Sequence, residues 1–327
     1  MIPAVELKPQ LLERQKRLKN AIDEMGETNH LVYLLQEVDA ALERMDEGIY
    51  GLCEICHDPI EEDRLRVDPL VRVCLGDLNK IQQRILEEDL SLASKLQTML
   101  LPRNDFTYNN WNIYYHYEPA GLVSGDYCDL VSTNGKASGE FYFILGDVSG
   151  KGVAASMLMT HMHAMFHSLI EFNLPLNALI SKVNKLLCES TLSTHFTTLV
   201  CGKAYSNGEI EICNAGHCLP VLIKEDTIAE IPSTGLPLGL FADQEYSVCK
   251  YHLNEGESIF LYTDGLSESR KEEIEYGTER IAKLAGELFG KSSVDFVNTF
   301  LTDIKSFLSG TSKLDDLTLL VINRFKG

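Results

Sequence analysis

The chain has 327 residues, of which 45% are hydrophobic, and a formal net charge of −19 at pH 7. This length predicts roughly two domains, and the acidic charge argues against a nucleic-acid partner, because phosphates need Lys and Arg for neutralisation. No segment approaches the roughly 18 uninterrupted apolar residues of a membrane span, and the first twelve residues lack the apolar core of a signal peptide. We therefore expect a cytoplasmic protein that has no membrane partner.

Two amphipathic helices are predicted at the N-terminus. Apolar residues recur at three- and four-residue intervals from Leu11 to Met25 and again from Leu31 to Met45. The polar stretch 26–29 should separate the two helices and fold them into a hairpin.

A cluster of cysteines follows the second predicted helix. Cys53 and Cys56 are two residues apart, and Cys74 and Asp77 repeat that gap after seventeen residues. Two such pairs form the tetrahedral site of a zinc ribbon, and a carboxylate is an accepted though less common fourth ligand. The alternative is a finger without metal, held by five apolar residues: Ile60, Leu65, Val67, Leu70 and Val73.

Residues 44–65, with the lead-in Gly-x-Tyr-Gly-x-Cys at 48–53, resemble the zinc finger of the DksA/TraR family. The resemblance covers roughly residues 20–80 and implies a helical hairpin that carries the finger, although Asp77 replaces the usual last cysteine. That family often acts at RNA polymerase through acidic residues at the tip of its coiled coil, and this activity is not carried over here.

A third helix is predicted from residue 78 to residue 101, and Pro102 ends it. It carries an apolar stripe that we interpret as a homodimer seam over residues 80–101. The expected division is a hairpin with a finger at 1–77, a linker helix at 78–102 and a second domain at 103–327. The stripe consists of Ile81, Ile85, Leu92 and Leu96.

The second domain is predicted to be α+β, a β-sandwich with its sheets inside and its helices outside. A hairpin is expected at Ser206-Asn207-Gly208, between two β-branched runs. The predicted helices cover 153–172, 176–191, 278–288 and 293–308. The predicted strands cover 112–117, 141–145, 197–205, 209–213, 219–223, 258–262 and 317–322.

Four acidic stretches, at 124–129, 146–152, 262–265 and 315–318, each place an aspartate where a strand should end. Their carboxylates would repel one another at neutral pH unless cations lay among them. A lone Asp-Gly pair is usually a turn, but four such stretches in this order predict a site for hard divalent metal ions. The aspartates are Asp126, Asp147, Asp264 and either Asp315 or Asp316.

Residues 90–325 resemble the PPM family of metal-dependent protein serine/threonine phosphatases, in its SpoIIE/RsbU branch. The four acidic stretches carry the resemblance, together with residues 92–97, Leu100-Leu101-Pro102, Asn214-Ala215-Gly216-His217 and residues 235–239, all in family order. The resemblance implies a phosphatase without a protein nucleophile, in which two Mg²⁺ or Mn²⁺ ions activate a water molecule.

The resemblance also implies a role for each acidic residue. Asp147 should bridge both ions with help from the Val148 carbonyl, and Asp126 should serve one ion, chiefly through water. Asp264 and Asp315 should bind the other ion, with Asp315 preferred over Asp316.

Several neighbouring residues have two interpretations each. Asp129 and Glu268 could support the metal site, but solvated loop positions are favoured. His217 could act as a general acid, but ordering of its own turn is favoured. Lys151 could meet the substrate phosphate at a helix start or be a surface lysine. The methionines and histidines of 157–167 are interpreted as helical core rather than as a metal stripe.

In this branch the substrate is typically a phosphorylated anti-sigma-factor antagonist of the STAS type, within a bacterial partner-switching pathway. The alternative hypothesis is a binding protein that uses the finger to attach to RNA polymerase or to a scaffold. The complete set of acidic residues favours catalysis.

Overall fold

The computed structural model describes residues 4–25, 29–77, 80–132, 139–150, 152–190, 195–272, 274–309 and 315–325. The chain divides into two compact units, Met1–Asp89 and Leu90–Gly327. Their boundary falls within helix α4 (Lys80–Leu100). The segment expected to be a linker helix therefore continues from one unit into the other. None of the helices in the described ranges combines the length and apolar character that a membrane crossing requires.

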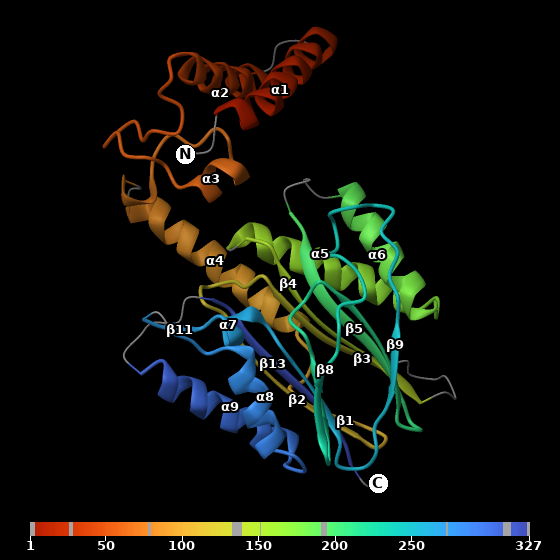
Figure 1. Cartoon of the computed structure of the whole chain (residues 1–327). Helices are drawn as coiled ribbons and strands as arrows, with labels where there is room; N and C mark the ends of the chain where they lie inside the picture. Colours follow the sequence, from red (N-terminus) through yellow and green to blue (C-terminus); the bar gives the residue numbers. More distant parts are fainter. Residues whose placement is uncertain are drawn as a thin grey trace. The chain divides into compact units, whose positions relative to one another are not determined.

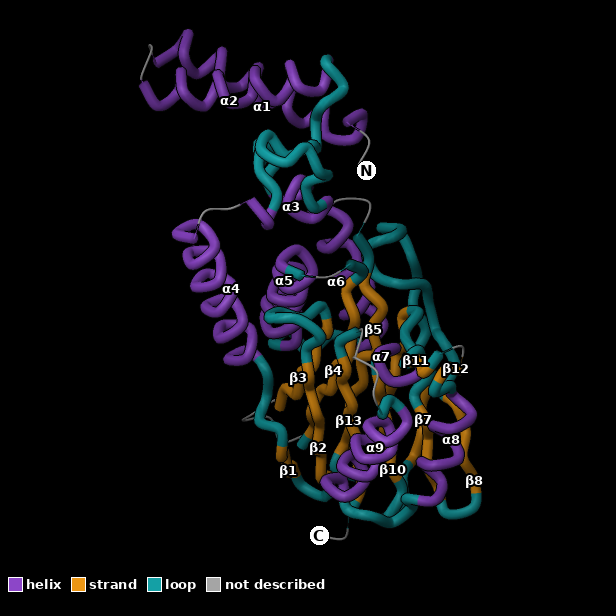
Figure 2. Tube along the Cα trace, turned by 90° about the vertical axis from the view of Figure 1, so that its left-hand side faces the viewer, coloured by secondary structure: helices purple, strands orange, loops and turns teal. Residues whose placement is uncertain are grey.

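Helices α1 (Ala4–Met25) and α2 (Asn29–Asp46) lie side by side in the N-terminal unit, as predicted (Figure 2). They run antiparallel, because Lys8 contacts Asp46 near one end of the pair and Gln15 contacts Asp39 further along. Their facing apolar side chains continue into the finger as one core. The fully buried members on the two helices include Leu11, Val38 and Ala41.

The finger follows α2 and contains α3 (Glu62–Val67) and the short 3-10 helix η1 (Leu75–Asp77). Ile60 and Leu65 are buried, and Leu70 and Val73 pack against them. Val67 was expected in the same apolar group, but its side chain is 61% exposed, so that prediction is wrong. It lies at the C-terminal end of α3, on the side facing away from Leu65.

The C-terminal unit contains two large antiparallel sheets. One has the order β1-β2-β13-β10-β7-β8 and the other has the order β3-β4-β5-β6-β9. The hairpin predicted at Ser206-Asn207-Gly208 joins β5 to β6, with Gly208 at a φ of 96°. The bounds of the first sheet are β1 (Asp105–Tyr108), β2 (Trp111–Glu118), β13 (Leu317–Arg324), β10 (Ser258–Tyr262), β7 (Val221–Lys224) and β8 (Thr227–Glu230). Those of the second are β3 (Asp126–Ser132), β4 (Glu140–Val148), β5 (Thr197–Tyr205), β6 (Glu209–Ala215) and β9 (Cys249–His252).

The two sheets pack face to face between two pairs of helices (Figure 1). Alternate side chains of both sheets fill the space between them, including the buried Trp111, Phe141 and Phe143. Helices α5 (Val153–Ile170) and α6 (Leu176–Ser190) cover the outer face of the five-stranded sheet. Helices α8 (Thr278–Glu287) and α9 (Ser293–Phe307) cover the six-stranded sheet. The predicted α+β sandwich is confirmed.

Four strands of the sandwich were not predicted: β1, β3, β8 and β9. Three of them have only four residues each, too few for an alternating pattern to stand out. The fourth, β3, begins with the polar sequence Asp126-Tyr127-Cys128-Asp129, which is buried on both faces.

The packing between the sheets predicts a large effect for one small substitution. A Cβ added at Gly202 on β5 would lie 2.0 Å from the ring of Phe143, so Gly202→Ala should lower the free energy of unfolding by roughly 3 kcal/mol. Denaturant unfolding followed by the fluorescence of Trp111, the single tryptophan, measures this unit. Gly121→Ala, where the nearest atom lies at 3.8 Å, should change it little. Equal stability of both variants would contradict the close packing.

Candidate functional site

Asp126 and Asp147 lie opposite each other on adjacent antiparallel strands. Asp126 is the first residue of β3, and its register partner Asp147 is the penultimate residue of β4. Asp126 is almost completely buried. Burial and the nearby Asp147 carboxylate raise the pKa of Asp126 well above its usual range. A cation between these carboxylates would remove the repulsion and allow both to ionise.

The second sheet contributes hydroxyl groups to the same carboxylate. Thr263 and Thr318 donate hydrogen bonds to Oδ2 of Asp126, at 3.0 and 2.5 Å. Thr263 directly follows β10 and precedes Asp264, and Thr318 is the second residue of β13. These bonds bring all four acidic stretches to one end of the sandwich.

The predicted placement at strand ends needs one correction. Asp147 and Asp264 do lie at the ends of β4 and β10, but Asp126 begins β3, and Asp315 and Asp316 directly precede β13. Because each pair of neighbouring strands is antiparallel, the start of one strand lies beside the end of the other. All these positions therefore share one edge.

Asp316 uses both of its carboxylate oxygens to hold the loop before β3. Its Oδ1 accepts a hydrogen bond from the Ala120 amide at 2.6 Å, and its Oδ2 accepts one from the Gly125 amide at 2.9 Å. Oδ1 of Asp315 accepts a bond from the next residue's amide at 3.0 Å. A Cβ at Gly265 would lie 1.8 Å from the Asp316 carbonyl oxygen, so only glycine allows the turn after Asp264 to approach this segment.

His217 is buried in the turn that it was predicted to order. Its amide donates to Oδ1 of Asn214 at 2.9 Å, and Nδ2 of Asn214 donates to the His217 carbonyl at 3.3 Å. Nδ1 of His217 lies 2.8 Å from the Thr198 hydroxyl. Burial lowers the pKa of His217 to about 4, so the imidazole is neutral at physiological pH. These features support a structural role over that of a general acid.

Asp129 does not lie in a solvated loop, contrary to the favoured interpretation. It is a buried residue of β3, and Oδ2 accepts hydrogen bonds from the Tyr127 hydroxyl and from Nε2 of His167, both at 2.8 Å. Burial alone would raise the pKa of Asp129, but the neighbouring imidazoles of His163 and His167 and the Tyr127 hydroxyl outweigh it and lower this pKa to about 2. The prediction of a solvated loop was wrong because β3, the strand that contains Asp129, was not predicted from sequence.

Helix α5 confirms the predicted core packing only in part. Met159, Met162 and Met165 are buried beneath the sheet, but Met157 is 66% exposed.

Glu268 is exposed, as its favoured interpretation expects, and its amide donates a hydrogen bond to the Asp264 carbonyl at the end of α7 (Asp264–Ser267). Lys151 lies outside the described residues.

Gln97 on α4 is a site residue that the sequence pattern did not predict. It is buried, donates from Nε2 to the Ser124 carbonyl at 2.6 Å and accepts from the Ser124 amide at 3.0 Å. Oγ of Ser124 in turn accepts a bond from the Asp126 amide at 3.0 Å. Its helix also contains Gln82 and Gln83, so no signal in the sequence singled out Gln97. Thr263 and Thr318 were also not predicted as site residues, although Thr263 directly precedes Asp264 and Thr318 lies two residues after Asp316.

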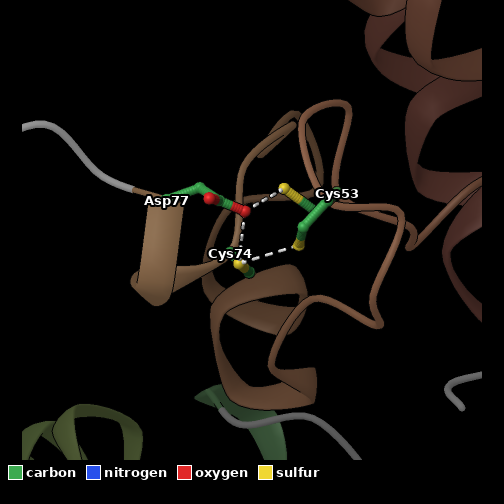
Figure 3. A group of neighbouring side chains, drawn as sticks. Cys53, Cys74 and Asp77 are labelled. Carbon is green, nitrogen blue, oxygen red and sulfur yellow. Dashed lines mark hydrogen bonds between the residues drawn. The ribbon is translucent and has the colours of Figure 1, made fainter.

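The finger gathers the four predicted zinc ligands, Cys53, Cys56, Cys74 and Asp77, and Figure 3 shows Cys53, Cys74 and Asp77 pointing toward one another. Sγ of Cys53 and Sγ of Cys74 lie 3.2 and 3.3 Å from Oδ2 of Asp77, and the sulfurs of Cys56 and Cys74 are 3.6 Å apart. The Asp77 carboxylate raises the pKa of Cys56 to about 12. Three thiols thus share one carboxylate, and a bound Zn²⁺ would take the place of their protons.

Two groups of at least three ligand side chains have all their ligand atoms within 4.8 Å of one another among the described residues. One is the finger, and the other is Asp129, His163 and His167. The acidic residues at the sandwich edge are not a third such group. The structure brings them to one edge through Asp126, and it does not place three of their carboxylates at that separation.

The buried His217 predicts a pH-dependent stability. The pKa of about 4 in the folded state lies below the ordinary 6.5, so the unfolded chain binds the proton first and stability falls as pH decreases from 6.5 to 4. The loss should amount to about 3 kcal/mol. His217→Gln should flatten this slope in urea unfolding followed by Trp111 fluorescence, whereas His252→Gln, at an exposed position on β9, should retain it. The same slope in wild type and His217→Gln would contradict this assignment.

Comparisons with known proteins agree with this geometry. Residues 137–325, more than half of the chain, match the family model described as Stage II sporulation protein E (SpoIIE). Residues 48–76 match the prokaryotic dksA/traR C4-type zinc finger. The chain is 26% identical over 274 residues to the phosphoserine phosphatase RsbU of Bacillus subtilis, covering 79% of each chain.

Solved structures show the same fold. The SiaA-PP2C domain of Pseudomonas aeruginosa is 18% identical with a TM-score of 0.64, over 75% of this chain and 98% of that domain. The RsbU and RsbW domains of a Mycobacterium tuberculosis protein are 26% identical with a TM-score of 0.57, over 69% of this chain and 62% of that one. The chain therefore belongs to the SpoIIE family of PPM-type protein phosphatases and carries a DksA/TraR-type zinc-finger segment at its N-terminal side.

Proposed function

We propose that this phosphatase hydrolyses phosphoserine or phosphothreonine in a protein substrate with the help of two Mg²⁺ or Mn²⁺ ions. The observation that carries the proposal is the meeting of both sheets at Asp126, which lies opposite Asp147 and is bonded by Thr263 and Thr318. The raised pKa of Asp126 supports the proposal, because a bound cation would offset the burial and the repulsion from Asp147 that disfavour its ionised form.

The donor groups at this edge suit hard cations. Asp126, Asp147, the Val148 carbonyl, Asp264 and Asp315 offer only oxygen, which Mg²⁺ and Mn²⁺ prefer. When bound, two such ions supply an activated water and neutralise charge on the phosphoryl group. Asp316 holds the neighbouring loop through both of its oxygens, which supports Asp315 as the ligand.

We further propose that the substrate is a phosphorylated STAS-type antagonist of an anti-sigma factor. The similarity to RsbU supports this class of substrate. So does the Mycobacterium tuberculosis relative, whose chain contains an RsbW domain beside its RsbU domain. All nine cysteines are free thiols, which supports a reducing compartment such as the cytoplasm.

The central test is the loss of metal-dependent activity. Asp147→Ala should lower the Mn²⁺-dependent release of phosphate from a phosphoserine protein on the order of 10³-fold, because the shared ligand of both ions is removed. Glu268→Ala changes an exposed carboxylate beside the same site and should retain most activity. Normal turnover by Asp147→Ala would overturn the proposed metal centre.

In this proposal the N-terminal unit and α4 regulate the activity of the metal centre. The finger would hold one Zn²⁺ through Cys53, Cys56, Cys74 and Asp77. The alternative function is that of a binding protein that attaches to RNA polymerase or another scaffold through the finger, and co-purification with the polymerase at physiological salt would favour it.

Helix α4 is proposed to pair with the same helix of a second chain. Ile85, Leu92 and Leu96 are each more than half exposed, and Met99 is 80% exposed. Ile85, Leu92 and Met99 recur every seven residues, and Leu96 follows Leu92 by four, as in a coiled-coil seam. The side chain of Ile81, the fourth residue of the predicted stripe, lies outside the described part. A strictly monomeric mass in solution would contradict this pairing.

Gln97 would couple that helix to the metal edge. Gln97→Ala leaves the buried amide and carbonyl of Ser124 without their partner, at a cost of about 1–3 kcal/mol, and should loosen the segment that begins with Asp126. We expect a higher Mn²⁺ requirement and roughly tenfold lower activity at limiting Mn²⁺. Lys95→Ala, at an exposed position on the same helix, is the control. A Mn²⁺ titration in which both variants match the wild type would argue against the coupling.

A further inference from the structure

A group of three side chains on the other side of β3 takes no part in the proposed hydrolysis. Nε2 of His167 lies 2.8 Å from Oδ2 of Asp129, and Nδ1 of His163 lies 3.2 Å from the same oxygen. The two imidazole rings are one helical turn apart on α5, with centroids separated by 4.1 Å. All three ligand atoms lie within 4.8 Å of one another.

This group is separate from the acidic edge. Successive side chains of a strand point to opposite faces, so Asp126 and Asp129, three positions apart, face opposite ways. Asp126 reaches Thr263 and Thr318 of the other sheet. Asp129 faces α5 together with Tyr127, whose ring packs in the core beneath that helix.

Hydrogen bonding alone leaves the group incomplete. Oδ2 of Asp129 accepts bonds from Tyr127 and His167, and Oδ1 accepts one from the Leu130 amide at 2.8 Å. Nδ1 of His163 is buried and, among the described residues, has no hydrogen-bond partner, although it lies beside that carboxylate. A buried ring nitrogen without a partner costs free energy, and a metal ion would satisfy it.

The donor set matches a transition metal rather than a hard cation. Two histidines at positions i and i+4 of a helix place both imidazoles on one side, the spacing that binds zinc in other helical sites. Ligand atoms around a tetrahedral zinc ion lie about 3.4 Å apart, given bond lengths near 2.1 Å, so small shifts from the observed separations would admit the ion. The side chain of His167 is 44% exposed, which leaves room for water as a fourth ligand.

We propose that Asp129, His163 and His167 form a binding site for one divalent transition-metal ion of the Zn²⁺ type, distinct from the Mg²⁺ or Mn²⁺ centre and from the finger. The ion fastens α5 to β3. Because α5 begins at Val153, shortly after Asp147 and Val148, this link holds the helix that follows the metal-binding loop.

The test measures zinc directly and does not depend on catalysis. The full chain is stripped with a chelator and dialysed against micromolar free zinc, with millimolar magnesium present to occupy the oxygen-lined edge. His167→Gln should hold one zinc ion per chain fewer than the wild type. His161→Gln, the same substitution six residues earlier on α5 and outside the group, should match the wild type. Equal zinc content in all three proteins would overturn the proposal, whatever the finger binds.

Thermal unfolding followed by Trp111 fluorescence gives a second readout, since Trp111 lies in the same unit as the site and the finger lies in the other. Added zinc should raise the unfolding midpoint of the wild type and of His161→Gln, and raise that of His167→Gln less. The half-exposed position of His167 means that the variant should fold. An equal zinc-induced shift in all three proteins, measured with millimolar magnesium present throughout, would contradict a transition-metal site.

Discussion

The hydrogen bonds from Thr263 and Thr318 to the buried Asp126 connect the two sheets at the edge where the acidic residues gather. A carboxylate with a raised pKa is a costly group to place between two sheets. Two hydroxyl donors offset part of that cost and fix the side chain. The position of β10 and β13 relative to β3 and β4 is therefore specified by a polar contact as well as by the apolar core between the sheets.

The longer strands were predictable from sequence because they are runs of β-branched and aromatic residues. The long helices were predictable because their apolar residues recur with the helical period. The strand β3 was not, since its side chains serve three purposes: Asp126 meets the other sheet, Cys128 fills the core between the sheets, and Asp129 meets α5. Polar and apolar residues therefore do not alternate along β3. The environment of Asp129 could not be predicted for the same reason.

The acidic residues of the edge were predictable as a set, because their spacing and glycine neighbours carry a chemical meaning in any fold. What the sequence could not supply was the division of work among them. Asp315 and Asp316 are adjacent and chemically identical, and the bonds from the Ala120 and Gly125 amides to Asp316 depend on a loop far away in the sequence. Gln97 likewise gains its role from a distant loop, through contacts that no local pattern encodes.

The opposite orientations of Asp126 and Asp129 restrict how this strand can change in evolution. A slip of β3 by one residue exchanges its two faces, so it would turn Asp129 toward the space between the sheets and Asp126 toward α5. An insertion or deletion of one residue between them would turn either Asp126 or Asp129 to the wrong face of the sheet. The length of this four-residue stretch should therefore be much less free to vary than the length of the loops at the opposite end of the sandwich.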